Sequence, residues 1–126
     1  TLVAEICGDI DPHTAKYFRG EIDKAIRSHN PLTLILDYSQ VTFMDSSGIG
    51  LVMGRYKIMS EMDGEVIVAS PPAYIRKVLQ LAGIHRLTKI VTDIAPYIQE
   101  KKADQEQNES PDAEKKESDK IETKAP

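Results

Sequence analysis

The sequence predicts an α/β fold in which parallel strands alternate with helices. Short apolar runs alternate along the chain with amphipathic stretches of roughly 10–17 residues at helical spacing. Parallel neighbours need a crossover connection, usually a helix, so this alternation implies parallel pairing in a layered sheet. A chain of 126 residues has the size of a single domain.

The first strand and the first helix are predicted from alternation and capping. Apolar residues alternate over residues 2–7, and Gly8 closes the strand. Asp11 fits the N-cap of the following helix, and Pro12 fits its first position, where a missing N–H costs nothing. The helix is expected to end near residue 29, because the proline at position 31 disfavours helical geometry before it.

The next three elements have equally local signals. Residues 32–38 are largely aliphatic and have turn-forming neighbours, which predicts a buried and central strand. The apolar pair 43–44 precedes a helix over residues 47–62, which an Asp-Gly pair ends. Residues 65–69 form the next predicted strand.

The last elements are shorter. A third helix is expected to start at the Ser-Pro-Pro run 70–72 and to end near Gly83, which suits the left-handed position after a helix. Residues 90–91 form a short strand, and the Thr-Asp pair 92–93 caps a last helix that runs through Ile98.

Residues 100–126 differ in composition from the rest of the chain. They carry nine acidic residues and six lysines, and Ile121 is their one sizeable apolar side chain. Such a segment has little to bury. We therefore expect a folded domain over residues 1–99 and a disordered acidic tail over residues 100–126.

Charge and hydropathy argue against several kinds of partner. The net charge is −4 for the chain and −1 for residues 1–99, without a basic stripe, so nucleic acid is not expected as a direct partner. No apolar run approaches a membrane span, no signal peptide is visible, and the lone Cys7 cannot form an internal disulfide. These features predict a cytoplasmic protein that does not bind membranes. Because the chain starts at Thr1 rather than Met, its N-terminus is expected to be trimmed or incomplete.

Residues suited to metal binding or catalysis form no recognisable pattern. The histidines at positions 13, 29 and 85 have no cysteine or carboxylate neighbour at ligand spacing. A phosphate-binding Gly-x-x-x-x-Gly-Lys loop does not occur, and Met44 stands where a nucleophile elbow would need glycine two places before Ser46. We expect no catalytic, metal-binding or cofactor-binding residue, and a serine hydrolase is the least favoured class.

The most informative segment is Asp-Ser-Ser-Gly at residues 45–48, where an apolar strand meets a helix. Asp and Ser are favoured N-cap residues, so capping alone would account for Asp45, Ser46 or Ser47. One cap is enough, which leaves a hydroxyl at a helix N-terminus, where unpaired N–H groups and the helix dipole favour a phosphoryl group. Asp11 also follows a strand, so a parallel sheet would bring it to the same edge.

The helix after this segment has two partly apolar faces. One face is expected in the core: Ile49, Val52, Met53, Tyr56 and Met59. The other face combines Leu51, Gly54, Arg55 and Ile58. A simple surface helix would carry charges there, so either the helix is deeply buried or its second face meets a partner protein. Both interpretations stay open at this point.

Residues 41–50 resemble the signature of STAS-domain anti-sigma factor antagonists, in which Val-Thr-Phe-Met precedes Asp-Ser-Ser-Gly-Ile-Gly. The Gly-Arg-Tyr-Lys run at 54–57 and the Gly-Asp-Ile-Asp run at 8–11 are similar to the sporulation branch of that family. The likeness extends from about residue 2 to residue 98, and the tail has no recognised counterpart.

The resemblance implies a mechanism and its partners. In the family, the unphosphorylated antagonist binds an anti-sigma factor that is also a serine kinase, and the sigma factor is released. The kinase then phosphorylates the residue that matches Ser46, binding ends, and a serine phosphatase resets the antagonist. The expected partner-binding residues are Asp11, Asp45, Ser46, Ser47, Gly48 and Ile49. The protein is expected to be non-enzymatic and monomeric when free.

The resemblance also implies a fold. The family has a single mixed sheet of four or five strands with helices largely on one face, and usually one more N-terminal strand, which is missing here. Two alternatives remain. One is an antagonist in a general stress-response sigma circuit, and the other is a regulatory STAS module, as in anion transporters, or a small binding domain for a nucleotide or a lipid.

Overall fold

The computed structural model describes residues 1–98 and 119–124 of the chain. Its elements are, in order, β1 (Leu2–Ile10), α1 (Pro12–His29), β2 (Thr33–Met44), α2 (Ser46–Glu61), β3 (Glu65–Ala69), α3 (Ala73–Leu81), the 3₁₀ helix η1 (Ile84–Arg86), β4 (Lys89–Val91) and β5 (Asp119–Lys124). Residues 95–98 are helical as well. Every strand and helix predicted up to residue 98 is therefore present.

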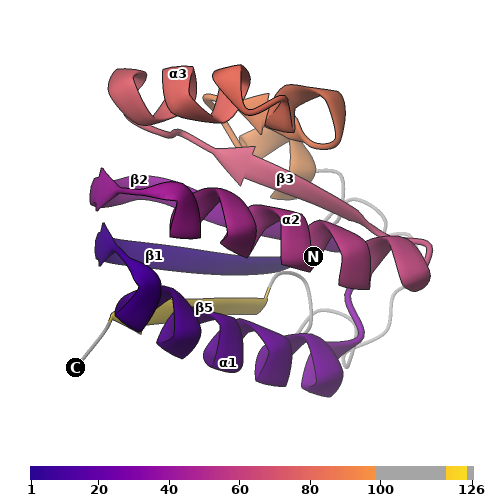
Figure 1. Ribbon diagram of the computed structural model, residues 1–126. Coiled ribbons are helices and arrows are strands. Elements are labelled where there is room, and N and C mark those ends of the chain that lie inside the picture. Colours follow the sequence, from indigo (N-terminus) through magenta and orange to yellow (C-terminus); the bar gives the residue numbers. More distant parts are fainter. Residues whose placement is uncertain (99–118, 125–126) are drawn as a thin grey trace.

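The five strands form one sheet in the order β4-β3-β2-β1-β5. Figure 1 shows α1 and α2 side by side across one face of this sheet, with α3 beside them. The expected α/β class, with a single sheet and helices largely on one face, is confirmed. None of the helices in the described ranges combines the length and apolar character needed to cross a bilayer.

The core has two unequal parts on the two faces of the sheet. The larger part lies under the helices and includes Ile6, Phe18 and Leu36, all fully buried. The smaller part lies on the opposite face, where Ile35 and Ile67 are covered by side chains of the last helical segment, such as Tyr97. The strands of the sheet centre are thus apolar on both faces, as expected for buried parallel strands.

Strands β1 and β2 are longer than the sequence predicted. β1 continues through Gly8 to Ile10, and Gly8 has a φ of +95° that suits glycine. The pairing of β1 with β2 shifts register on both sides of residues 7–8, as at a β-bulge. Turn-forming residues therefore bend β1 without ending it, because the neighbouring strand continues to pair with it.

Two expectations about strands are wrong. The family fold implied a mixed sheet, but all four pairings between described strands are parallel. Helical crossovers connect each strand from β1 to β4 with the next one, and β5 runs in the same direction as β1. Part of the tail expected to be disordered, residues 119–124, forms β5. The rest of that predicted tail, residues 100–118 and 125–126, lies outside the described residues.

Two side chains explain why β5 pairs with β1. Ile121 packs against the main core, and Thr123 is buried and donates a hydrogen bond of 2.8 Å to the carbonyl oxygen of Glu5. Between them, Glu122 is exposed. This alternation of buried and exposed positions is typical of a strand at the edge of a sheet.

Helix α2 is more deeply buried than a surface helix, which decides between the two readings of its second face. Leu51 and Arg55 on that face are 4% exposed, whereas Met53, expected in the core, is 47% exposed. The helix packs against both the sheet and α1, so its buried side includes residues that face α1. The prediction for Met53 is therefore wrong.

Candidate functional site

The neighbouring ends of β1 and β2 bring the two predicted acidic residues together. Ile10 is the register partner of Met44, and the N–H of Asp45 donates to the carbonyl oxygen of Ile10 at 3.2 Å. Asp11 and Asp45 directly follow these strand ends and are the N-caps of α1 and α2. The predicted shared edge is confirmed, and it carries two helix N-termini.

Asp45, rather than either serine, caps α2. Its Oδ1 accepts a hydrogen bond of 2.8 Å from the N–H of Ser47, and its carbonyl oxygen accepts one of 3.0 Å from the N–H of Gly48. Ser46 is the first residue of the helix, its side chain is exposed, and its hydroxyl has no hydrogen-bond partner among the described residues. The Ser46 hydroxyl is therefore available for modification.

Asp11 forms a capping box with Thr14 at the start of α1. Its Oδ1 accepts from the N–H of Thr14 at 2.8 Å, and the Thr14 hydroxyl accepts from the N–H of Asp11 at 2.9 Å. The hydrogen bond from the Thr14 N–H is the main reason that the pKa of Asp11 lies below its ordinary value. Asp11 therefore presents a negative charge at this edge at neutral pH.

Gly48 is required by the packing beneath the first turn of α2. A Cβ on Gly48 would lie 2.0 Å from Cγ and 2.3 Å from Sδ of Met44, so no larger residue fits without displacement. Met44 is the last residue of β2 and is buried. The glycine of the Asp-Ser-Ser-Gly segment thus allows the helix that begins at Ser46 to sit close to the strand end.

A buried tyrosine also fixes the first turn of α2. The hydroxyl of Tyr38, on β2, donates to the carbonyl oxygen of Gly48 at 3.2 Å. Tyr38 is fully buried, and desolvation raises its pKa far above the ordinary value, so it stays protonated and donates. Sequence reasoning missed this residue, although it is an aromatic side chain two positions after the aliphatic run 34–36.

An ion pair joins α1 to α2 about two helical turns beyond Gly48. Nε of Arg55 lies 2.9 Å from Oδ1 of Asp23, and the two side chains are 5% and 23% exposed. The N–H of Arg55 Nε is not aligned for a hydrogen bond with Oδ1 of Asp23. Nη1 of Arg55 has no hydrogen-bond partner among the described residues. Burial lowers the pKa of Arg55, and Asp23 opposes that shift. Sequence reasoning missed Asp23.

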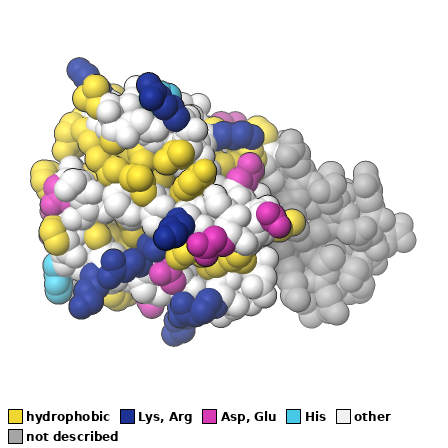
Figure 2. All heavy atoms as spheres, turned by 45° about the vertical axis from the view of Figure 1, so that its right-hand side comes forward, with side chains coloured by type: hydrophobic (Ala, Val, Ile, Leu, Met, Phe, Trp, Pro, Cys, Tyr) yellow, Lys and Arg dark blue, Asp and Glu magenta, His cyan; other side chains and the backbone are white. Residues whose placement is uncertain are grey.

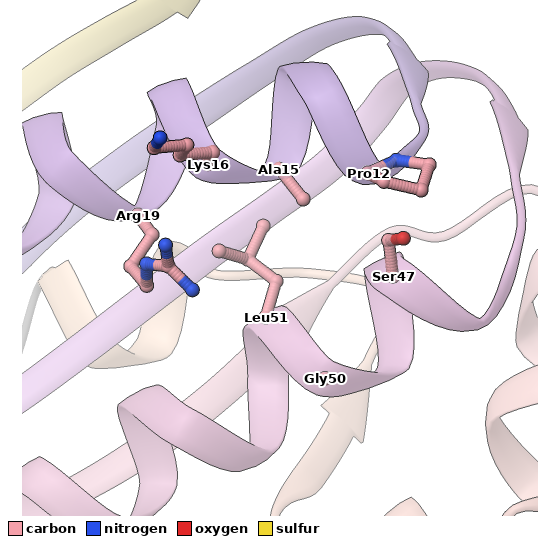
Figure 3. Close-up of a pocket in the computed structure, with 7 residues that line it drawn as sticks. All are labelled: Pro12, Ala15, Lys16, Arg19, Ser47, Gly50 and Leu51. Carbon is pink, nitrogen blue, oxygen red and sulfur yellow. The ribbon is translucent and has the colours of Figure 1, made fainter.

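A groove separates α1 from α2 next to the edge. It has a volume of about 380 Å³, and its lining is Pro12, Ala15, Lys16, Arg19, Ser47, Gly50 and Leu51 (Figure 3). Ser47 thus borders the groove and directly follows the exposed Ser46. No set of three or more metal-ligating side chains occurs in the described part of the chain.

Apolar side chains are exposed near the same edge. Phe43 is 48% exposed and directly precedes Met44, and Tyr74 is 53% exposed while its hydroxyl donates to the carbonyl oxygen of Met44 at 3.3 Å. Figure 2 shows a face of the molecule on which hydrophobic side chains gather beside scattered charges. A surface of this mixed character suits a protein partner better than a nucleic acid.

Comparison with known proteins agrees with this geometry. A model of the STAS domain matches residues 1–100. An anti-sigma F factor antagonist from Lysinibacillus sphaericus is 36% identical over 84 residues, which cover 67% of this chain and 72% of that protein. The sequence relationship therefore spans the edge at Asp11 and the Asp-Ser-Ser-Gly segment.

Two solved structures are similar in fold and sequence. The anti-sigma factor antagonist SpoIIAA in its unphosphorylated form has 30% identity and a TM-score of 0.65, covering 75% of this chain and 83% of that one. The Bacillus cell fate determinant SpoIIAA in its phosphorylated form has 32% identity and a TM-score of 0.55, covering 71% and 80%. The similarity to the sporulation branch of the family that the sequence indicated is confirmed.

Proposed function

This chain belongs to the STAS domain family and is homologous to anti-sigma F factor antagonists, and from this premise we propose that it is an anti-sigma factor antagonist switched by phosphorylation of Ser46. The unphosphorylated form binds an anti-sigma factor with serine-kinase activity and frees the sigma factor. Phosphorylation of Ser46 by that kinase ends binding, and a serine phosphatase restores it. The protein acts by binding and catalyses no reaction itself.

The observation that carries this proposal is the division of roles between Asp45 and Ser46. Asp45 supplies the cap of α2, whereas the exposed Ser46 hydroxyl makes no described hydrogen bond to the helix. A phosphoryl group on Ser46 therefore removes no contact that stabilises α2. A phosphoryl group at the first position of α2 meets the positive end of the helix dipole. The protein itself therefore tolerates the modification, and its fold need not change.

The partner does not tolerate the modification equally well. Phosphorylation adds a charge of about −1.5 to −2 near pH 7. A partner surface that buries the neutral Ser46 hydroxyl must then desolvate a dianion, and such mismatches cost several kcal/mol. About 3 kcal/mol weakens binding roughly a hundredfold, so a local charge change suffices as the switch.

The predicted partner-binding residues divide by exposure. Asp11, Asp45, Ser47 and Ile49 are partly exposed and Ser46 is exposed, so all five are available for contact. Gly48 is buried, and we assign it the role of letting α2 sit against Met44 rather than a contact with the partner.

Phosphorylation mapping tests the proposal. The protein would be incubated with a purified anti-sigma F factor and Mg-ATP, and phosphopeptides would be identified by mass spectrometry. We expect one phosphate on Ser46, no phosphate on Ser46→Ala, and normal phosphorylation of the matched variant Ser47→Ala. Phosphate on another residue, or failure of the unmodified chain to bind the anti-sigma factor, contradicts the proposal. A parallel titration with an anti-sigma B factor would show whether the chain acts instead in a general stress-response circuit.

A further inference from the structure

The groove between α1 and α2 has a lining of one charge sign. Lys16 and Arg19 come from α1, the other five lining residues are uncharged, and no carboxylate borders the groove. Figure 3 shows Arg19 extending from α1 toward α2, beside Leu51. Both cations are exposed, and neither has an ion pair with a residue that the structure describes. Positive charge therefore gathers at one place on a domain whose net charge is close to zero.

A third cation lies behind the groove. Arg55 follows the lining residue Leu51 by one helical turn, and Arg19 is one of the charges that disfavour its protonated form. Asp23 is the counter-charge that the structure shows for Arg55. Lys16 and Arg19 have no such counter-charge among the described residues, and an anion placed beside them between α1 and α2 would offset their charge.

The shape of the groove admits a side chain from outside. Gly50 forms part of its α2 wall, and a Cβ built on Gly50 would meet no atom within 4 Å. The N-terminal turns of α1 and α2 border the groove at Pro12 and Ser47, and the side chains of Asp11 and Asp45 already cap these two helix ends. The two cations and the open space at Gly50 therefore favour a negatively charged occupant on the Lys16 and Arg19 side of the groove.

We propose that this groove receives an acidic side chain of the anti-sigma factor, held between Lys16 and Arg19, which rests on the function proposed above. The groove adjoins Ser46 through Ser47, so a partner that buries the Ser46 hydroxyl also covers the groove. A partner carboxylate docked there lies close to the site of phosphorylation. The phosphoryl group then repels that carboxylate and competes for the same cations, so one modification removes an attraction and adds a repulsion.

Charge reversal on α1 tests the proposal. The affinity of a purified anti-sigma F factor would be measured by calorimetry for the unmodified chain and for Lys16→Glu, Arg19→Glu and Lys24→Glu. Lys24 is an exposed lysine on the same helix outside the groove, so it controls for net charge and helix content. We expect losses of about tenfold or more for the two groove variants and about twofold or less for Lys24→Glu. Circular dichroism would verify that all variants are folded.

A steric pair at one position provides a second test. Gly50→Leu fills the groove, whereas Gly50→Ala changes the helix but leaves most of the space open. We expect the leucine variant to lose affinity and the alanine variant to keep it. Equal binding by both variants, together with normal binding by Arg19→Glu, overturns the groove proposal while the antagonist function stands. No binding by the unmodified chain overturns the antagonist function instead.

The occupant can then be identified on the partner. Each acidic surface residue of the anti-sigma factor would be changed to lysine and tested against Arg19→Glu. One such variant is expected to restore affinity to the reversed groove. If none restores it, the cations act through long-range attraction, and the docked side chain is overturned.

Discussion

Gly48 and Met44 are packed so closely that a single added methyl group has no space. The Cβ of an alanine at position 48 would lie 2.0 Å from Cγ of Met44, which is near the backbone and cannot swing away freely. The relationship ties the start of α2 to the end of β2, and with it the position of Ser46.

The first prediction follows from this contact. Gly48→Ala is expected to lower the free energy of unfolding by about 1–3 kcal/mol through overpacking. Gly50→Ala is the matched control, because that Cβ meets open space and alanine favours a helix by up to about 1 kcal/mol. Urea denaturation measures both variants. In a Met44→Ala background the cost of Gly48→Ala should fall, and an unchanged cost there contradicts the packing explanation.

Capping and modification are expected to separate at Asp45 and Ser46. Asp45→Ala removes the cap of α2 and should cost about 0.5–2 kcal/mol of stability. Ser46→Ala and Ser46→Asp should change stability by less than about 0.5 kcal/mol, because the Ser46 side chain is exposed and makes no described hydrogen bond. Ser46→Asp should still weaken the complex with the anti-sigma factor. A large fall in the thermal midpoint of Ser46→Ala would show that Ser46 is mainly structural.

The ion pair between α1 and α2 has a predictable cost of removal. Asp23→Ala leaves the buried Arg55 without its counter-charge and should lower the free energy of unfolding by about 2–3 kcal/mol. This loss is somewhat smaller than the loss expected for a fully buried ion pair, because Asp23 is 23% exposed. Glu21→Ala, an exposed acid on the same helix, is the control and should be nearly neutral. Replacing the pair together, by Asp23→Leu and Arg55→Met, should recover part of the loss. Equal stabilities of the two alanine variants would rule out a structural role for the pair.

Acid should weaken the cap of α1 in a defined pH range. The pKa of Asp11 is lowered below 3.8 in the folded protein, chiefly by the hydrogen bond from the Thr14 N–H. A lowered folded-state pKa means that the cap stabilises the fold at pH values above 3.8 and loses this contribution as the pH falls through the folded pKa. Compared with Asp11→Asn, the native chain should lose more stability between pH 5 and pH 2, measured by urea denaturation at each pH. A constant difference between the two proteins would contradict the assignment.

The β5 strand should be necessary for a stable sheet edge. Deleting residues 119–126 removes the packing of Ile121 and the hydrogen bond of Thr123, with an expected loss of roughly 1–3 kcal/mol. The bare edge of β1 should also favour self-association, which size-exclusion chromatography with light scattering detects. Ile121→Ser should reproduce part of the instability and the exposed Glu122→Ser should not. A truncated chain that is as stable and as monomeric as the full one would show that β5 is dispensable.

Local features were predictable from the sequence because their physical causes are local. The capping of α1 by Asp11, with Pro12 at its first position, depends on hydrogen bonds within one turn. The alternation of strands and helices depends on side-chain periodicity, and it led directly to parallel pairing. The family resemblance added the identity of the switch residue, Ser46, which remains a prediction until the phosphosite is mapped.

The tertiary structure decided which candidates share a site and which residues support it. Three candidate caps stood in a row, and only the folded geometry shows that Asp45 is used and Ser46 is left exposed. The groove between α1 and α2 joins two segments that have no common sequence signal. The pairing of β5 with β1 connects residues more than a hundred positions apart. The sequence alone determined the order of the predicted elements up to residue 98 and the approximate start of the helices, because propensity and capping act over a few residues. Contacts between distant segments decided the rest, because packing energy depends on neighbours that only the fold brings together.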